Sequence, residues 1–411
     1  MIIHFSVLAV ILVCALIWER PIRYHKLNSI YYGERYDYKS PLMPWLIVFG
    51  YIAYLAAMRS GMNDTSGYIQ SFEHIPGTWD DVSRILDGDG KDKAFDITAN
   101  IFKMYVSDDY HGWFGLFAAV ESCIFIHVLR RESVSFLDSC FVLFATALYY
   151  NYFSMMRQWF AVVLLFGGTI FIKEGKTIPY ILLCLFAAQF HNSAYLFIPV
   201  YFMVTGRAWS PKQNLIIIAA VVGLFFLRPI LDAVESSLAN STYDYAVAAM
   251  NSDSGSSIIR PVIAAVPVVI AYIHRDRIDA GNKMIHICIN MSLINFLLNL
   301  LATFTCGLYV IRLATYTAGY SLILYPYLLE CDGQQSKQER PESGILYSVF
   351  YFLLLSDVPS GFVGVQQRHS GSILLRGEVM HDDRASQGFE PVYHHEPRRR
   401  GDHGDELLSE Y

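Results

Sequence analysis

The sequence predicts an all-α, polytopic integral membrane protein, and three observations support this fold class. Of its 411 residues, 54% are hydrophobic and only 17% are charged, whereas soluble globular chains carry about 25% charged residues. The mean hydropathy is +0.33. Apolar runs recur along nearly the whole chain. This composition excludes a disordered protein and a secreted disulfide scaffold. It also excludes a nucleic-acid partner, because the net charge of −6 offers no bulk attraction for polyanions.

Each apolar run is interpreted as one membrane helix. A bilayer core of about 30 Å needs about 20 apolar residues as a helix, and about 17 are tolerable. The first run lacks a basic n-region and a small-residue cleavage site, so it is interpreted as an uncleaved span. The sequence therefore predicts 11 or 12 spans, at 2–18, 42–58, 112–129, 134–152, 159–172, 177–190, 194–204, 214–231, 260–273, 284–304, 313–329 and, more weakly, 344–356.

The sequence divides into a transmembrane region, 1–356, and a polar tail, 357–411. The tail loses the apolar pattern and contains no lysine, which indicates a disordered extension or a frameshifted end. Within the transmembrane region, only three residues separate 177–190 from 194–204, which predicts a broken hairpin near 177–204. Two polar loops are long: 59–111, which is acidic, and 232–259, which is rich in Ser and Asn.

The loop charges predict the orientation, because Lys and Arg favour short cytoplasmic loops. When the N-terminus is placed outside, every short inner loop carries Lys or Arg. The same orientation places both long polar loops outside.

Three arginines lie at the outer ends of spans, where positive charge is disfavoured. Arg59 closes the second span, Arg157 lies in the turn after the fourth, and Arg312 interrupts a late apolar run. Snorkelling to interfacial water explains a single arginine. Three on one face favour an anion site, because guanidinium groups bind phosphate oxygens bidentately and stay charged when partly buried. A pyrophosphate group is the natural ligand at a membrane surface.

Six further residues extend this candidate site. Asp64 and Thr65 either cap a short helix or place a carboxylate and a hydroxyl beside the arginines. His191, at the tip of the broken hairpin, either accepts a proton from a sugar hydroxyl or is satisfied by neighbouring backbone. Candidate sugar contacts are Tyr68, Gln158 and Tyr316. No Cys/His metal spacing and no nucleotide-binding motif occurs, so neither a metal nor a cofactor is expected.

Four motifs in order resemble the EpsG family of Wzy-like polysaccharide polymerases. The first, Arg59-x-Gly61-x-x-Asp64-Thr65-x-x-Tyr68, resembles the family's R-x-G-x-D-T-x-x-Y, with one extra residue after Gly61. The others are Met156-Arg157-Gln158-x-x-Ala161, Ala187-x-x-Phe190-His191-x-Ser193-Ala194 and Arg312-x-x-x-Tyr316. The resemblance covers about residues 30–330 and leaves out the tail.

This resemblance implies a GT-C-like, Wzy-like fold in the bacterial inner membrane and a role in capsule, exopolysaccharide or O-antigen assembly. The substrate would be a glycan on undecaprenyl pyrophosphate, joined at the periplasmic face to the sugar hydroxyl of another lipid-linked unit without a metal or cofactor. A chain-length regulator and a flippase are the expected protein partners. Arg157 and Arg312, with Arg59, would clamp the pyrophosphate, and His191 or Asp64 would accept the proton.

Two other functional classes stay open. The first is a different membrane transferase, either an O-antigen ligase, which needs a larger outer loop, or a sugar O-acyltransferase, which needs a cytoplasm-facing histidine. The second is a transporter such as a lipid-linked oligosaccharide flippase. A flippase should line a central cavity with charges from many spans, whereas here the charges gather at one face.

Overall fold

The computed structural model confirms the all-α class. Throughout the described part of the chain the secondary structure is helical, with no strand. The run 344–356, the tail 357–411 and most of the loop 232–259 lie outside that part, so the predictions made for them are not addressed by the structure. The described residues are 2–19, 40–225, 256–304 and 307–336, without 63 and 89.

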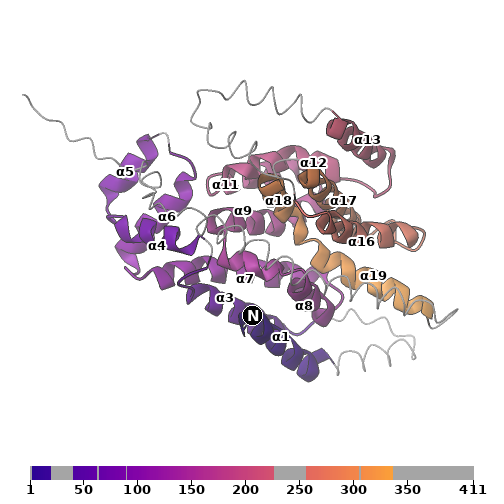
Figure 1. Ribbon diagram of the computed structural model, residues 1–411, viewed down its shortest axis with the longest axis horizontal. Coiled ribbons are helices and arrows are strands. Elements are labelled where there is room, and N and C mark those ends of the chain that lie inside the picture. The colour runs from indigo at the N-terminus through magenta and orange to yellow at the C-terminus, as the bar shows by residue number, and fades with distance from the viewer. Residues whose placement is uncertain are drawn as a thin grey trace, which may run out of the picture. The chain divides into compact units, whose positions relative to one another are not determined.

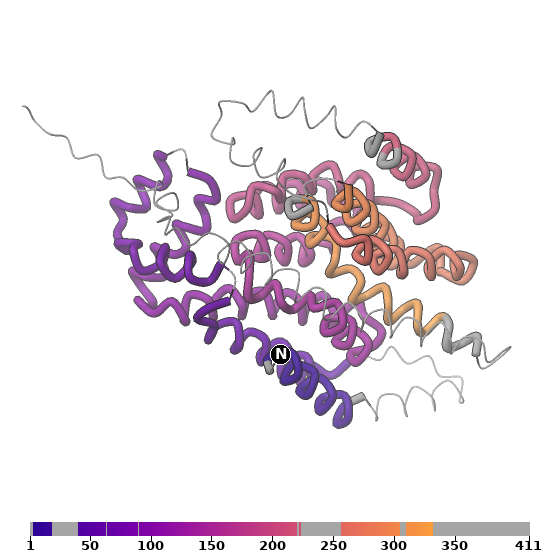
Figure 2. The backbone as a smooth tube through the Cα atoms, in the orientation of Figure 1, coloured from indigo at the N-terminus to yellow at the C-terminus, as the bar shows by residue number. Residues whose placement is uncertain are grey.

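Three helical segments are long and apolar enough to cross a membrane. They are α7 (Tyr110–Glu132), the consecutive α9 (Met156–Gly167) and α10 (Thr169–Glu174), and α17 (Lys283–Phe304). Together with the shorter helices they establish an all-α polytopic membrane protein (Figures 1 and 2). The shorter helices are α1 (Ile2–Cys14), α3 (Leu42–Ala57), α8 (Phe136–Ala145), α11 (Thr177–Ala187), α12 (Phe197–Val204), α13 (Pro211–Phe225), α16 (Ile259–Ile273), α18 (Gly307–Ala318) and α19 (Ser321–Ser336).

Two apolar runs differ from straight spans. The predicted break in 177–204 is confirmed: α11 ends at Ala187, and a turn and a short 3₁₀ helix, Asn192–Leu196, precede α12. The run 134–152 was expected as one span and is instead two helices, α8 and the 3₁₀ helix Leu148–Phe153. The reason is local, because Ala147 adopts a left-handed backbone (φ 51°), which an α-helix cannot continue through.

The predicted polar loop 59–111 is largely helical. It forms α4 (Thr65–His74), α5 (Trp79–Asp87) and α6 (Lys93–Tyr105), which together are called the cap. The cap is fastened by aromatic side chains, because Phe72 of α4 stacks on Trp113 of α7 with ring centroids 6.0 Å apart. Phe95 of α6 meets the same indole edge-on at 5.6 Å. In Figure 1 the three cap helices gather at one end of α7 and α9.

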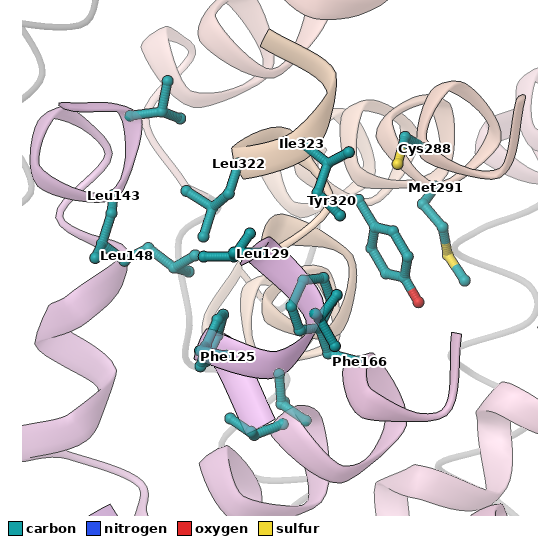
Figure 3. Close-up of a cluster of buried hydrophobic side chains, with 14 of the residues drawn as sticks. Phe125, Leu129, Leu143, Leu148, Phe166, Cys288, Met291, Tyr320, Leu322 and Ile323 are labelled. Carbon is teal, nitrogen blue, oxygen red and sulfur yellow. The ribbon is translucent and has the colours of Figure 1, made fainter. Parts of the chain in front are cut away.

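The main core brings the late helices against the early ones. α7 packs between α3 and α9, and α19 packs against α8 and α17. Figure 3 shows Phe125 and Leu129 of α7 in this core, together with Phe166 of α9. Phe166 meets Tyr320 edge-on at 5.4 Å, and Tyr320 shares a 2.8 Å hydrogen bond with Thr169. These contacts hold α9 beside the segment that links α18 to α19.

Candidate functional site

Arg157 lies in the first turn of α9, directly under the cap. Its Nη2 donates to Asp96 Oδ1 at 3.0 Å, and its Nη1 lies 3.7 Å from Asp92 Oδ2. The guanidinium carbon also sits 4.7 Å from the centre of the Phe95 ring, a cation–π distance. Because 28% of the side chain is exposed, Arg157 is accessible from solvent while two carboxylates of α6 balance its charge.

His191 lies in the turn after α11, next to the same carboxylates. Its Nδ1 is 3.7 Å from Asp92 Oδ2, beyond direct hydrogen-bond distance, and this buried nitrogen has no hydrogen-bond partner among the described residues. The rest of the ring reaches the surface, since 33% of the side chain is exposed. Asp92 Oδ1 accepts a hydrogen bond from the backbone N–H of Asn192 at 3.3 Å. Asp92 therefore lies between Arg157 and the His191 turn.

Arg312 is brought to this end of the helices by a backbone contact. Its carbonyl accepts a 2.7 Å hydrogen bond from Nε2 of Gln158, the residue that follows Arg157. The Arg312 Nε is buried and has no hydrogen-bond partner within the described ranges. Because Gln158 is itself buried, it serves to join α9 to α18, and the unpartnered donor of Arg312 stays available.

Tyr316 connects α18 to the turn that carries His191. Its hydroxyl lies 2.9 Å from Ser193 Oγ, and its ring stacks on Phe197 at 4.5 Å. Tyr316 lies one helical turn after Arg312, so both side chains share one face of α18. Residues from the second, third and fourth motifs are thus joined into one cluster of Arg157, His191 and Arg312.

Arg59 occupies a different environment from the other two arginines. Its side chain is 6% exposed and donates to the backbone carbonyls of Tyr152 and Ala56. Its guanidinium carbon lies 4.2 Å from the centre of the Phe114 ring, and its Nη2 is 3.5 Å from Met156 Sδ. Arg59 therefore packs beneath the turn that precedes Arg157.

The remaining residues of the first motif shape the entry to α9. α4 begins directly after Asp64, but the carboxylate caps nothing in that helix, and its two oxygens lie 3.1 and 3.3 Å from the backbone nitrogen of Met155. The buried Thr65 donates its hydroxyl to the Met62 carbonyl. Burial, reinforced by Asp64 and opposed by Arg157, raises the pKa of Tyr68 to about 12, so this phenol stays neutral.

Sequence reasoning assigned no role to Asp92 and Asp96, which it noted only as part of an acidic loop. Asp92 adopts a left-handed backbone (φ 56°) at the start of α6, which is uncommon for a residue other than glycine. Burial raises the pKa of Asp96, and Arg157 opposes that shift. The sequence offers only a weak signal, because Asp92 and Asp96 lie four residues apart in the acidic loop but Asp92 precedes α6 and is not part of that helix. Over the described ranges, no three His, Cys, Asp or Glu side chains are grouped to hold a metal ion.

The fold and this cluster define a class: an all-α polytopic membrane protein with arginines, carboxylates and a histidine gathered beneath a helical cap. Within that class, the EpsG family matches residues 42–361, and the chain belongs to this family. The resemblance drawn from the four motifs is thereby confirmed. Membership supports a polysaccharide-polymerase-like role in membrane polysaccharide biosynthesis. No curated protein and no solved structure matches the chain.

Proposed function

We propose that this protein is a membrane glycosyltransferase that polymerises undecaprenyl-pyrophosphate-linked oligosaccharide repeat units. The family supports the general role. The observation that carries the finer assignment is the joining of Arg157, His191 and Arg312 through Asp92, Gln158 and Tyr316. Such a cluster offers cations for a leaving pyrophosphate and a base for an attacking hydroxyl.

The two arginines would act on the leaving group. Glycosyl transfer breaks the bond between the anomeric carbon and a pyrophosphate oxygen, which takes the electron pair and gains negative charge. Arginines stabilise such charge through fixed hydrogen-bond donors, usually the largest contribution to this chemistry. Arg157 is partly exposed, and Arg312 holds a buried donor with no hydrogen-bond partner in the described structure. Both features suit a phosphate clamp that needs no metal or cofactor.

His191 would accept the proton of the acceptor sugar hydroxyl as that oxygen bonds to the anomeric carbon. Its ring is one-third exposed, whereas the alternative base, Asp64, already accepts from the Met155 backbone. An imidazole is also well suited to proton transfer near neutral pH. In this proposal Asp64 fixes the backbone that leads into Arg157.

The other candidate substrate contacts bond within the protein in this structure. Gln158 binds the backbone carbonyl of Arg312, Tyr316 binds the hydroxyl of Ser193, and Arg59 holds the turn before α9. They would position the clamp, while Tyr68 and Thr65 would shape its cap side. The proposed location is the periplasmic face of the bacterial inner membrane, with the N-terminus in the periplasm. A chain-length regulator and a flippase of the same pathway would be the protein partners.

A polymer profile tests this function. The gene is deleted in its host, and the glycans and lipid-linked oligosaccharides are analysed after complementation with wild type, Arg157→Ala or Arg312→Ala. We expect loss of long polymer with single-repeat lipid carriers in the periplasm, restored by wild type alone. Unchanged polymer length after deletion, or near-normal polymer from both variants, would refute the proposal. Lipid-linked carriers retained on the cytoplasmic side would indicate a flippase. Loss of acetyl groups from the polymer would indicate an acyltransferase, and polymer that is not attached to lipid A would indicate a ligase.

A reporter fusion after Asn192 tests the orientation separately. The proposal places this residue, which follows His191 in the turn after α11, on the periplasmic side. An alkaline phosphatase fusion there should therefore be active, and a green fluorescent protein fusion dark. The opposite pattern would place the cluster in the cytoplasm, where a periplasmic polymerase cannot use it.

A further inference from the structure

The start of α6 is built around the His191 turn through several independent contacts. The backbone N–H of Ala94 donates to the Gln189 carbonyl at 3.0 Å. Asp92 Oδ1 accepts from the backbone N–H of Asn192 at 3.3 Å, and Asp92 Oδ2 lies 3.7 Å from His191 Nδ1. The cap thus holds the backbone on both sides of His191 and places a carboxylate beside the imidazole.

The two carboxylates of α6 divide their partners. Asp96 makes the shorter contact with Arg157, at 3.0 Å, and no ion pair links it to His191 within the described residues. Asp92 is 3.7 Å from both the Arg157 and His191 nitrogens, and it alone also binds the Asn192 backbone. Only 13% of the Asp92 side chain is exposed, so water screens its charge less than that of a surface carboxylate.

The buried nitrogen of the imidazole lies beside Asp92. Nδ1 of His191 has no hydrogen-bond partner in the described part of the chain, and Asp92 is the acid that forms an ion pair with it. A carboxylate at one ring nitrogen selects the tautomer, fixes the ring plane and stabilises the imidazolium that forms when the other nitrogen takes a proton. Asp92 has a left-handed backbone (φ 56°) and directly precedes α6, so it stands at the junction between this helix and the His191 turn.

We propose that Asp92 is the positioning residue for His191, orienting the imidazole through Nδ1 so that Nε2 accepts the proton of the acceptor hydroxyl. This inference rests on the proposed glycosyl transfer. In the step, the hydroxyl oxygen bonds to the anomeric carbon, the pyrophosphate leaves with the bonding electrons, and the proton moves to Nε2. The Asp92 carboxylate faces the imidazolium that forms. It touches no substrate, so its effect must pass through His191.

The first experiment measures polymerisation kinetics in nanodiscs with a lipid-linked repeat unit. Asp92→Asn keeps the shape, the acceptor for Asn192 and a residue that tolerates the left-handed backbone. It should lower kcat about 100-fold with KM nearly unchanged, against about 1000-fold for His191→Ala. In the His191→Ala background, Asp92→Asn should cost no further activity, because residues that act as a unit are not additive. Multiplying losses would overturn the proposal.

Two control variants separate positioning from general effects of charge. Asp108→Asn removes an exposed acid of the same long loop, and its kcat should equal that of wild type. Asp96→Asn acts on Arg157 instead, so its loss should persist in the His191→Ala background. If Asp92→Asn also loses further activity in that background, as Asp96→Asn does, then Asp92 acts through Arg157 and the proposal fails.

A second measurement does not depend on polymerase activity. Diethylpyrocarbonate acylates neutral imidazole, and peptide mass spectrometry resolves its rate at His191 from the rates at the other histidines. Loss of the facing carboxylate should change the acylation rate of His191 several-fold in Asp92→Asn, because the ring is no longer held through Nδ1, and should leave it unchanged in Asp108→Asn. An unchanged rate in Asp92→Asn overturns the pairing. If the acylation rate changes in Asp92→Asn but the wild-type protein makes no polymer, the pairing of Asp92 with His191 stands and the proposed function is rejected.

Discussion

The two ends of the span formed by α9 and α10 carry the same kinds of charge in different arrangements. At one end, Lys173 Nζ donates to both oxygens of Glu132, at 2.9 and 2.7 Å. At the other end, Arg157 makes a short ion pair with Asp96 and shares Asp92 at 3.7 Å with His191. The first end is a closed ion pair. The second is an open network, in which Arg157, His191, Asp92 and Asp96 lie together but only the Arg157–Asp96 pair is within hydrogen-bond distance.

From this difference we expect the chemistry at the second end. In the closed pair Lys173 engages both oxygens of Glu132, and Arg131 Nε lies 3.3 Å from one of them, so the carboxylate is used in contacts within the protein and contributes to packing. Around Arg157, by contrast, the buried Nδ1 of His191 and the buried Nε of Arg312 have no hydrogen-bond partners within the described residues. Buried polar atoms are normally satisfied, so these two are candidates for groups that a ligand or a reaction completes. The comparison predicts that variants at one end change activity and that variants at the other change stability.

Arg157 should give the largest effect. Arg157→Ala removes a guanidinium that would stabilise the leaving pyrophosphate, and kcat/KM should fall about 1000-fold, or about 4 kcal/mol. Arg157→Lys keeps the charge without the bidentate fork and should recover only part of this loss. Polymerisation by purified protein in nanodiscs provides the measurement. Equal losses in Arg157→Ala and Lys173→Ala would abolish the distinction between the two ends.

Arg59 sharpens the comparison because it is a cation at the active end with a packed environment. Arg59→Ala leaves the Tyr152 carbonyl without this donor and opens space against Phe114. We expect a loss of about 3 kcal/mol in unfolding free energy, seen as a lower thermal midpoint in nanodiscs. Growth at lower temperature should restore polymer in this variant and not in Arg157→Ala. Normal stability with lost activity would instead make Arg59 a direct ligand of the substrate.

The sequence predicted the convergence of the arginines better than it predicted their roles. Alternation of spans and turns predicts Arg59, Arg157 and Arg312 at one end. In the structure Arg59 contacts Met156 and Gln158 binds the Arg312 carbonyl, so both adjoin the first turn of α9, which carries Arg157. Hydropathy cannot tell a guanidinium that faces solvent from one that binds a carbonyl, because that depends on neighbours distant in sequence. The burial of Arg59 against Phe114 and Tyr152 was therefore beyond prediction.

The cap shows the same limit on a larger scale. The loop 59–111 is polar, which indicates exposure, yet its helices are fastened by Phe72 and Phe95 to Trp113. Isolated aromatics in a polar segment carry no periodic signal strong enough to reveal such packing. Since that packing brings α6 to Arg157, the roles of Asp92 and Asp96 also required the structure.

The closed pair at the other end should give a smaller effect. Glu132→Gln leaves Lys173 without its charged partner while keeping the side-chain volume. With the two side chains 31% and 11% exposed, the expected loss is about 1 kcal/mol of unfolding free energy. The polymer profile should match wild type, which thermal unfolding and a glycan gel measure on the same preparation. Shortened polymer in a stable variant would show that this end also serves the reaction.

The smallest effect tests the open network by pH. Burial holds the pKa of Asp96 above its ordinary value, so the folded protein binds this proton more tightly than the unfolded chain. Unfolding free energy should therefore gain from Asp96 as pH falls through the window between the raised value and the ordinary aspartate range. As pH is lowered from 7.5 to 5, the unfolding free energy of wild type should rise relative to Asp96→Asn by less than about 1 kcal/mol, seen as a higher thermal midpoint. The difference in midpoint between wild type and Asp108→Asn should stay constant. A fall relative to Asp96→Asn would show that attraction to Arg157 outweighs burial, making this end as closed as the Lys173–Glu132 pair.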